Sequence, residues 1–111
     1  MQKVIVVGGG PAGMMAAAVA AENGAWVTLL EKKEQAGRKL KLTGKGRCNL
    51  TSALDGENFI SGYAGNGRFL YSALNQFPNQ DLISFFNKRG LATIIERGQR
   101  VFPASGRAED V

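Results

Sequence analysis

Two groups of residues have types and spacings that could do chemistry. The first is GGGPAG, residues 8–13, a G-x-G-x-x-G run, together with Glu31. Gly8 permits a tight turn, Gly10 lets backbone approach a pyrophosphate, and Gly13 lets a helix pack closely on a strand. The N–H groups that open the helix would face the anion, and the Glu31 carboxylate could accept hydrogen bonds from a ribose. This group predicts a dinucleotide site, and a carboxylate at position 31 disfavours the 2′-phosphate of NADP, which leaves FAD or NAD.

The second group is TGKGRCNLT, residues 43–51, which contains the single cysteine of the chain, Cys48. It is not a Walker P-loop, because Gly44-Lys45 is followed by Gly46 rather than by serine or threonine. Nucleic-acid binding is disfavoured, because residues 32–51 contain no aromatic side chain on which a base could stack.

Cys48 has two interpretations. Neighbouring basic residues could lower the pKa of its thiol, so a redox role with a partner group elsewhere stays open. A nucleophilic thiol usually needs a base, however, and the sequence has no histidine. We favour a small buried apolar residue.

Composition narrows the classes of function. The net charge is +5, and seven of the 14 basic residues fall between Lys32 and Arg47, which suits either a phosphate-bearing partner or a solvated face. The sequence has one cysteine and no histidine, which excludes a disulfide framework within the chain and histidine-based catalysis. The same composition disfavours a zinc site, so no metal is expected, and it indicates a cytoplasmic location. The uncharged stretch from Val4 to Ala21 could pass for a signal peptide, but GGGP interrupts its apolar region. Nothing else in the sequence approaches a membrane span, so no membrane partner is expected.

Three elements must position the first group. Residues 3–7 (KVIVV) predict a strand buried on both faces, residues 12–23 a helix with Pro11 at its start and Gly24 as its cap, and residues 25–31 a second strand. Strand, helix and strand over this length form a βαβ unit with parallel strands. The fold class is therefore α/β.

The rest of the chain predicts mixed structure. Residues 32–62 are irregular, 67–77 and 81–89 are helical with Asn79 as the cap of the second helix, and 91–97 and 99–102 form two strands that turn at Gly98. The apolar residues around Phe77 and Phe85-Phe86 predict core. ASGRAEDV, residues 104–111, begins a further helix, and we expect the chain to be the front part of a longer protein.

These motifs carry a family resemblance. VIVVGGGPAGMMAAAVAAENGAWVTLLEK (4–32) resembles the dinucleotide-binding motif of FAD-containing oxidoreductases of the glutathione-reductase structural class. GRKLKLTGKGRCNLT (37–51), YAGNGRFLYSALNQF (63–77) and RVFPASGRAEDV (100–111) are similar to the flavoprotein family that includes aminoacetone oxidases and a reductase of bile-acid dehydroxylation. Lys45 departs from that family, which often has a third glycine there.

The resemblance implies a Rossmann-like FAD/NAD(P)-binding domain with a parallel sheet, incomplete at the C-terminus. Its parts would be a nucleotide unit (1–31), a cofactor-side loop (32–62) and a helical and short-strand segment (63–111), without the remaining FAD and substrate domains. The implied cofactor is FAD, with NAD(P)H as an optional electron donor to the longer protein. The expected cofactor-binding residues are Gly8, Gly10, Pro11, Ala12, Gly13, Glu31, Lys32, Arg38, Lys39, Thr43, Gly44, Arg47, Cys48 and Asn49.

The function that follows is the N-terminal portion of an FAD-dependent oxidoreductase, whose 111 residues alone are expected to be inactive. Its partners would be FAD and a small-molecule substrate, with neither nucleic acid nor membrane. No catalytic residue, substrate or oligomeric state is assigned. Two alternatives stay open: an NAD-binding dehydrogenase domain, and a truncated dinucleotide-binding fragment without catalysis.

Overall fold

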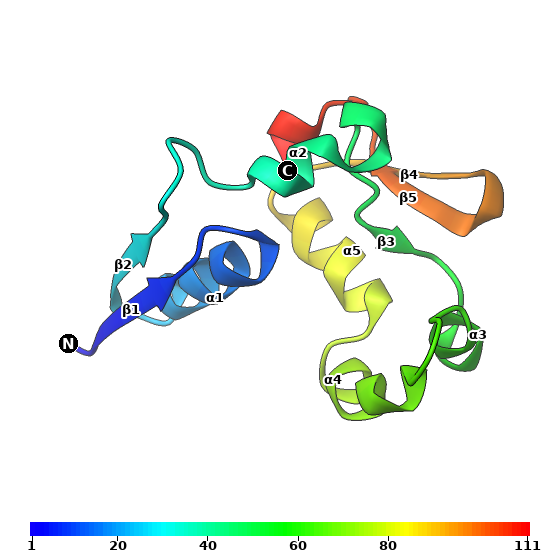
Figure 1. Ribbon diagram of the computed structural model, residues 1–111, viewed down its shortest axis with the longest axis horizontal. Coiled ribbons are helices and arrows are strands. Elements are labelled where there is room, and N and C mark those ends of the chain that lie inside the picture. The colour runs from blue at the N-terminus through cyan, green and yellow to red at the C-terminus, as the bar shows by residue number, and fades with distance from the viewer. The chain divides into compact units, whose positions relative to one another are not determined.

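The computed structural model describes residues 1–111, which divide into two units, Met1–Leu42 and Thr43–Val111 (Figure 1).

The first unit is a βαβ unit followed by a short helix. Strand β1 (Lys3–Val7) leads to helix α1 (Pro11–Glu22), strand β2 (Trp26–Leu30) and helix α2 (Arg38–Leu42). The two strands are parallel, and the register places Val4 opposite Val27 and Val6 opposite Leu29. The predicted α/β class with a parallel sheet is confirmed.

Helix α1 begins and ends as the sequence predicts. Pro11 occupies its first turn, where the missing N–H costs no hydrogen bond. Gly24 follows the helix with a φ of +88°, and its N–H donates to Ala21 O at 3.0 Å. A left-handed residue at this position is the common way to end a helix, and glycine adopts it without strain.

The β1–β2 sheet is covered on one face only. Val4, Val6, Val27 and Leu29 are half-buried, and they alternate along the strands with exposed residues. Val7 is 81% exposed and Trp26 is 64% exposed, on the opposite face. The expectation that strand 3–7 is buried on both faces is wrong for this structure, because α1 covers one side of the sheet and no element of the unit covers the other.

The second unit contains three helices and a small antiparallel sheet. The helices are α3 (Gly56–Ser61), α4 (Tyr71–Gln76) and α5 (Asn79–Lys88), and the strands are β3 (Thr51–Ser52), β4 (Thr93–Glu96) and β5 (Arg100–Pro103). Strand β5 lies between β3 and β4, with Val101 opposite both Thr51 and Ile95. Short 3-10 turns occupy 43–46, 67–70, 97–99 and 108–110.

The core of the second unit gathers on β5. Val101, Phe102 and Pro103 are buried, and so are Cys48 and Ala108. The predicted strand pair is confirmed, and Gly98 turns the hairpin with a φ of +75°. Strand β5 is the central strand of this sheet, and Val101, Phe102 and Pro103 are buried, whereas no residue of β3 or β4 is fully buried.

Several local expectations are corrected. The span 32–62, expected to be irregular, contains α2, β3 and α3. The predicted helix 67–77 is a 3-10 turn followed by α4, and the helix expected in 104–111 is only the 3-10 turn at 108–110. Phe69 is 81% exposed and Phe77 is 44% exposed, so neither is core in this unit. The spacing of apolar residues predicts an apolar face on a helix. It does not show whether another element packs against that face.

Asn79 also differs from its predicted role. Pro78 occupies the cap position of α5, and no side chain caps that helix. The buried Asn79 amide instead donates to Ser52 O and to Leu54 O, the latter at 2.8 Å. It therefore ties the start of α5 to β3 and to the segment that follows it. None of the helices is both long enough and apolar enough to cross a membrane.

Candidate dinucleotide-binding site

The glycine turn, residues 8–13, joins β1 to α1, and the start of the helix packs tightly against the end of the strand. Gly8 has a φ of +99°, and its N–H donates to Leu30 O at 2.7 Å, so the turn begins while the chain is still paired with β2. A Cβ atom on Gly13 would lie 1.8 Å from Gly8 O. Only glycine fits at position 13, and its predicted role in close packing of helix and strand is confirmed.

The opposite side of the turn is open. Gly10 has a φ of −77°, and a Cβ atom there would meet nothing within 4 Å. Helix α1 has 12 residues, no side-chain cap and no acidic residue in its first turn. The N–H groups of Ala12 and Gly13 have no acceptor within the helix, and the helix dipole places partial positive charge here. An anion approaching Gly10 would meet these donors directly.

Glu31, just after β2, is bound to the turn. Its Oε1 accepts a hydrogen bond from Gly9 N at 2.9 Å, and its Oε2 accepts one from Lys33 N at 2.7 Å. The N–H of Lys33, then that of Gly9, lower the pKa of the carboxyl. Desolvation opposes them, and the charges of Lys32 and Lys33 lower the pKa further. The carboxylate is therefore ionised at neutral pH, with further lone pairs for ribose hydroxyls.

Gly9 and Gly37 form a contact that sequence reasoning missed. Gly37 N donates to Gly9 O at 2.7 Å, and these two glycines are the buried residues of the unit Met1–Leu42. Gly37 has a φ of +71°, and a Cβ atom there would lie 3.1 Å from Met14 Cε. The Ala36-Gly37 pair just before a basic segment is the signal that could have drawn attention to this position.

The three basic residues predicted for the site in this unit lie in solvent. Lys32 follows Glu31, while Arg38 and Lys39 begin α2 directly after Gly37, and all three are exposed. The Gly37–Gly9 hydrogen bond therefore holds the start of α2 at the glycine turn. Gly8, Gly10, Pro11, Ala12, Gly13, Glu31, Lys32, Arg38 and Lys39 all belong to this one unit.

Thr43, Gly44, Arg47, Cys48 and Asn49, the remaining predicted site residues, belong to the second unit. Gly44 has a φ of +57°, and a Cβ atom there would lie 2.8 Å from Phe102 Cε1. Asn49 donates through its amide to Thr51 O at 2.9 Å and to Val101 O at 3.2 Å in the orientation that satisfies both carbonyls. The segment thus packs on the small sheet through contacts that explain its glycine and its asparagine.

Cys48 is buried in this segment. Its side chain is 2% exposed, and its backbone N–H donates to Thr43 O at 3.0 Å. Burial raises the pKa of the thiol, and a hydrogen bond with the Thr43 side chain opposes that effect only in part. The environment is that of a protonated, unreactive thiol, as the apolar interpretation of Cys48 predicts.

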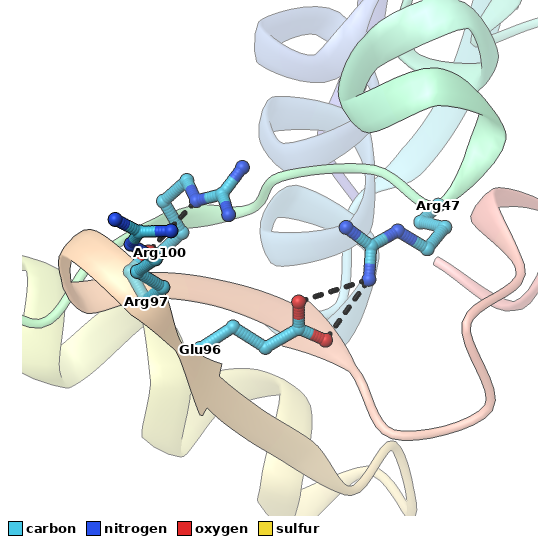
Figure 2. A network of polar contacts seen from close by, with 4 residues as sticks. All are labelled: Arg47, Glu96, Arg97 and Arg100. Carbon is cyan, nitrogen blue, oxygen red and sulfur yellow. Dashed lines mark hydrogen bonds and ion pairs between the residues drawn. The ribbon is translucent and has the colours of Figure 1, made fainter.

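Arg47 connects the segment 43–49 to the β4–β5 hairpin (Figure 2). Its Nη1 donates to Glu96 Oε2 at 2.9 Å and to Oε1 at 3.0 Å, and its guanidinium carbon lies 4.0 Å from the centroid of the Phe102 ring. Glu96, which sequence reasoning did not single out, is thereby the charge partner of Arg47. The bifurcated bond and the stacked ring hold the guanidinium in one place.

Together, a parallel βαβ unit, a G-x-G-x-x-G turn packed on its own helix and a carboxylate after the second strand define a dinucleotide-binding domain of the Rossmann class. Comparison with known proteins identifies the family. Residues 2–111 match the model of the HI0933-like protein Rossmann domain, and the chain belongs to that family.

Relatives with assigned activities are similar over different lengths. The 3-dehydro-bile acid delta(4,6)-reductase of Clostridium scindens is 37% identical over 114 residues, which cover 100% of this chain and 27% of that protein. The ribosomal RNA dihydrouridine synthase of Escherichia coli is 37% identical over 89 residues, 79% of this chain and 22% of the relative. The N,N-dimethylglycine/sarcosine dehydrogenase of Chromohalobacter salexigens is 57% identical over 44 residues, 40% of this chain and 6% of the relative. The chain thus spans about a quarter of the length of the first two relatives.

Proposed function

We propose that the chain is the N-terminal, FAD-binding portion of an oxidoreductase, and that it holds the ADP part of FAD through the turn 8–13 and Glu31. One observation carries this proposal: Glu31 Oε1 accepts from Gly9 N at 2.9 Å. The carboxylate suited to the ribose and the turn suited to the pyrophosphate are thus fixed to one another.

The residues present fit such a cofactor. The space in front of Gly10 is open, whereas the space between Gly13 and Gly8 is filled, so backbone can approach a phosphate on one side and is supported on the other. Pro11, Ala12 and Gly13 open a helix with no side chain capping it. FAD, when bound, supplies the redox chemistry, and this chain binds and orients it.

Charged residues of the first unit would complete the site. Glu31 would repel a 2′-phosphate, which favours FAD or NAD over NADP. Lys32, Arg38 and Lys39 would offset the charge of the pyrophosphate. In the second unit we retain Thr43, Gly44 and Asn49 as cofactor-side residues. For Arg47 and Cys48, the Glu96 ion pair and the burial favour a supporting role within that segment.

The relatives support redox chemistry but differ in the substrates that their names give. One is a reductase of a 3-dehydro-bile acid, one is a dihydrouridine synthase of ribosomal RNA, and one is a dehydrogenase. We therefore propose the reaction class, oxidation and reduction through a flavin, with NAD(P)H as an electron donor to the longer protein. The absence of nucleic-acid binding, the cytoplasmic location and the inactivity of these 111 residues alone stay predictions.

The absorption spectrum of the purified chain tests the proposal. After incubation with FAD and thorough desalting, we expect the flavin bands to stay with the protein. Glu31→Ala, which removes both the ribose acceptor and the bond to Gly9, is expected to lose them. Glu34→Ala is the matched control, because it deletes an exposed carboxylate three residues away.

The outcomes separate the candidate functions. Flavin retained by the wild type and by Glu34→Ala but lost from Glu31→Ala supports the proposal. A folded wild-type chain that retains no flavin, but binds NADH in a parallel titration, would favour the NAD-binding dehydrogenase alternative instead.

A further inference from the structure

The orientation of two peptide groups in the glycine turn can be read from their partners. In a trans peptide the C=O and the following N–H point in opposite directions, and the chain contains no cis peptide. In the Gly8–Gly9 peptide, the N–H donates to Glu31 and the C=O faces Gly13, on the opposite side. Both ends of this peptide are therefore fixed.

The Gly9–Gly10 peptide is fixed from one end only. Its C=O accepts from Gly37 N at 2.7 Å, which directs the Gly10 N–H away from Gly37. Gly10 itself has room for a ligand to approach, because a Cβ atom on it would meet nothing within 4 Å. We infer that Gly37 is a positioning residue of the dinucleotide site: its N–H holds the Gly9 carbonyl, and thereby points the Gly10 N–H at the pyrophosphate.

This inference rests on the proposed function, and it adds a residue and a role that the motif itself does not contain. Gly37 touches no part of the ligand in this scheme; it acts through the peptide of the turn. Its own geometry explains why glycine stands there, since φ is +71° and Met14 Cε lies 3.1 Å from where a Cβ atom would be. A side chain at position 37 would strain the backbone and push Met14, and the Gly37–Gly9 bond would lengthen.

The ratio of the affinities for ADP and for adenosine tests this role, because the inferred effect concerns the phosphates. For Gly37→Ala we expect ADP affinity to fall about tenfold, the order expected when a hydrogen bond to a charged group is weakened. Adenosine affinity should change by less than about twofold, since the Glu31 contact is retained. A general loss of structure would lower both affinities together.

Gly24→Ala is the matched control. Gly24 also has a positive φ, +88°, but a Cβ atom there meets nothing within 4 Å, and it lies at the far end of α1. We expect both affinities to stay within about twofold of the wild type. Met14→Ala/Gly37→Asn is the rescue variant, because asparagine tolerates the left-handed conformation and the shortened Met14 leaves room for it; its affinity ratio should return toward that of the wild type.

Equal loss of both affinities in a folded Gly37→Ala, an unchanged ratio, or the same fall in Gly24→Ala would each overturn the inference. If Gly37→Ala does not fold, Gly37→Asn takes its place, with a fall in the ratio of about threefold. If the wild-type chain binds neither ADP nor FAD, the proposed function fails. Hydrogen exchange then decides the geometry: a protected Gly37 amide supports the bond to Gly9, and exchange at the rate of an exposed amide overturns it.

Discussion

Arg47 and Glu96 are 49 positions apart in the sequence, and they form an ion pair with 2.9 Å between Nη1 and Oε2. The pair joins the segment 43–49 to the end of β4, and the Phe102 ring lies under the guanidinium at 4.0 Å. The Arg47 side chain is 37% exposed and that of Glu96 is 32% exposed, so solvent screens the attraction. Its contribution to stability is therefore expected to be modest and measurable.

A double-mutant cycle with Arg47→Ala and Glu96→Ala measures that contribution. We expect a coupling free energy of about 0.5–1 kcal/mol from denaturant unfolding, the range of partly exposed ion pairs. Arg47→Lys keeps the charge but loses the planar stack on Phe102, so it should recover only part of the loss. Arg107→Ala, which removes an exposed arginine of the same unit, is the control. A coupling energy of zero would mean that the pair does not anchor the segment.

Gly13 and Gly10 should respond to alanine in different ways. A Cβ atom on Gly13 would lie 1.8 Å from the backbone oxygen of Gly8, so Gly13→Ala is expected to destabilise the unit by about 4 kcal/mol or more. Gly10→Ala has open space and a φ of −77°, so we expect an unchanged circular dichroism spectrum but weaker FAD binding. Unfolding caused by Gly10→Ala, or a fully stable Gly13→Ala, would contradict this division of roles.

Glu31 should give ligand binding a pH dependence. Hydrogen bonds from Lys33 N and Gly9 N lower the pKa of this carboxyl below its ordinary value of 4.5. A carboxyl whose pKa is lowered on folding contributes stability at a pH above its unfolded-state pKa, and that stability is lost as the pH falls through its folded-state pKa. The ionised carboxylate is also the proposed acceptor for the ribose, so binding should follow the same titration. ADP affinity should therefore stay level from neutral pH to 4.5 and weaken only below it.

Titrations of ADP binding over that range, with circular dichroism recorded in parallel, check the expectation. Glu31→Gln should bind more weakly and lose the acid transition, while Glu34→Gln should keep it, because Glu34 is exposed. A transition above the ordinary glutamate pKa, or one that persists in Glu31→Gln, would show that another group controls binding.

Cys48 should be unreactive in the folded chain. It is 2% exposed, and burial raises the pKa of its thiol, so the thiolate that attacks a disulfide reagent is scarce at neutral pH. We expect labelling by a chromogenic disulfide to be more than about tenfold slower than in denaturant. The denatured chain is the reference, and equal rates in the two states would favour the redox role over the apolar one.

The sequence predicts the first unit well for a physical reason. Strand, turn, helix and strand follow one another within 31 residues, and the period of the apolar residues, Pro11 and the glycines specify each element locally. The predicted strand 3–7 coincides with β1, and Gly24 ends α1 as expected. Asn79 shows where such reasoning fails. An asparagine before a helix is a typical cap, yet the carbonyls of Ser52 and Leu54 bind its amide, and only the folded chain brings them there.

The glycine spacing and Glu31, taken as sequence alone, determined the class of fold and the turn suited to a dinucleotide, because these depend on neighbours along the chain. Tertiary structure alone decided that Gly37 holds Gly9 and that Arg47 pairs with Glu96. Those contacts join residues that are far apart in the sequence. No helical or strand period encodes these contacts. They form only when the chain folds, because side chains then pack closely and buried polar groups need hydrogen-bond partners.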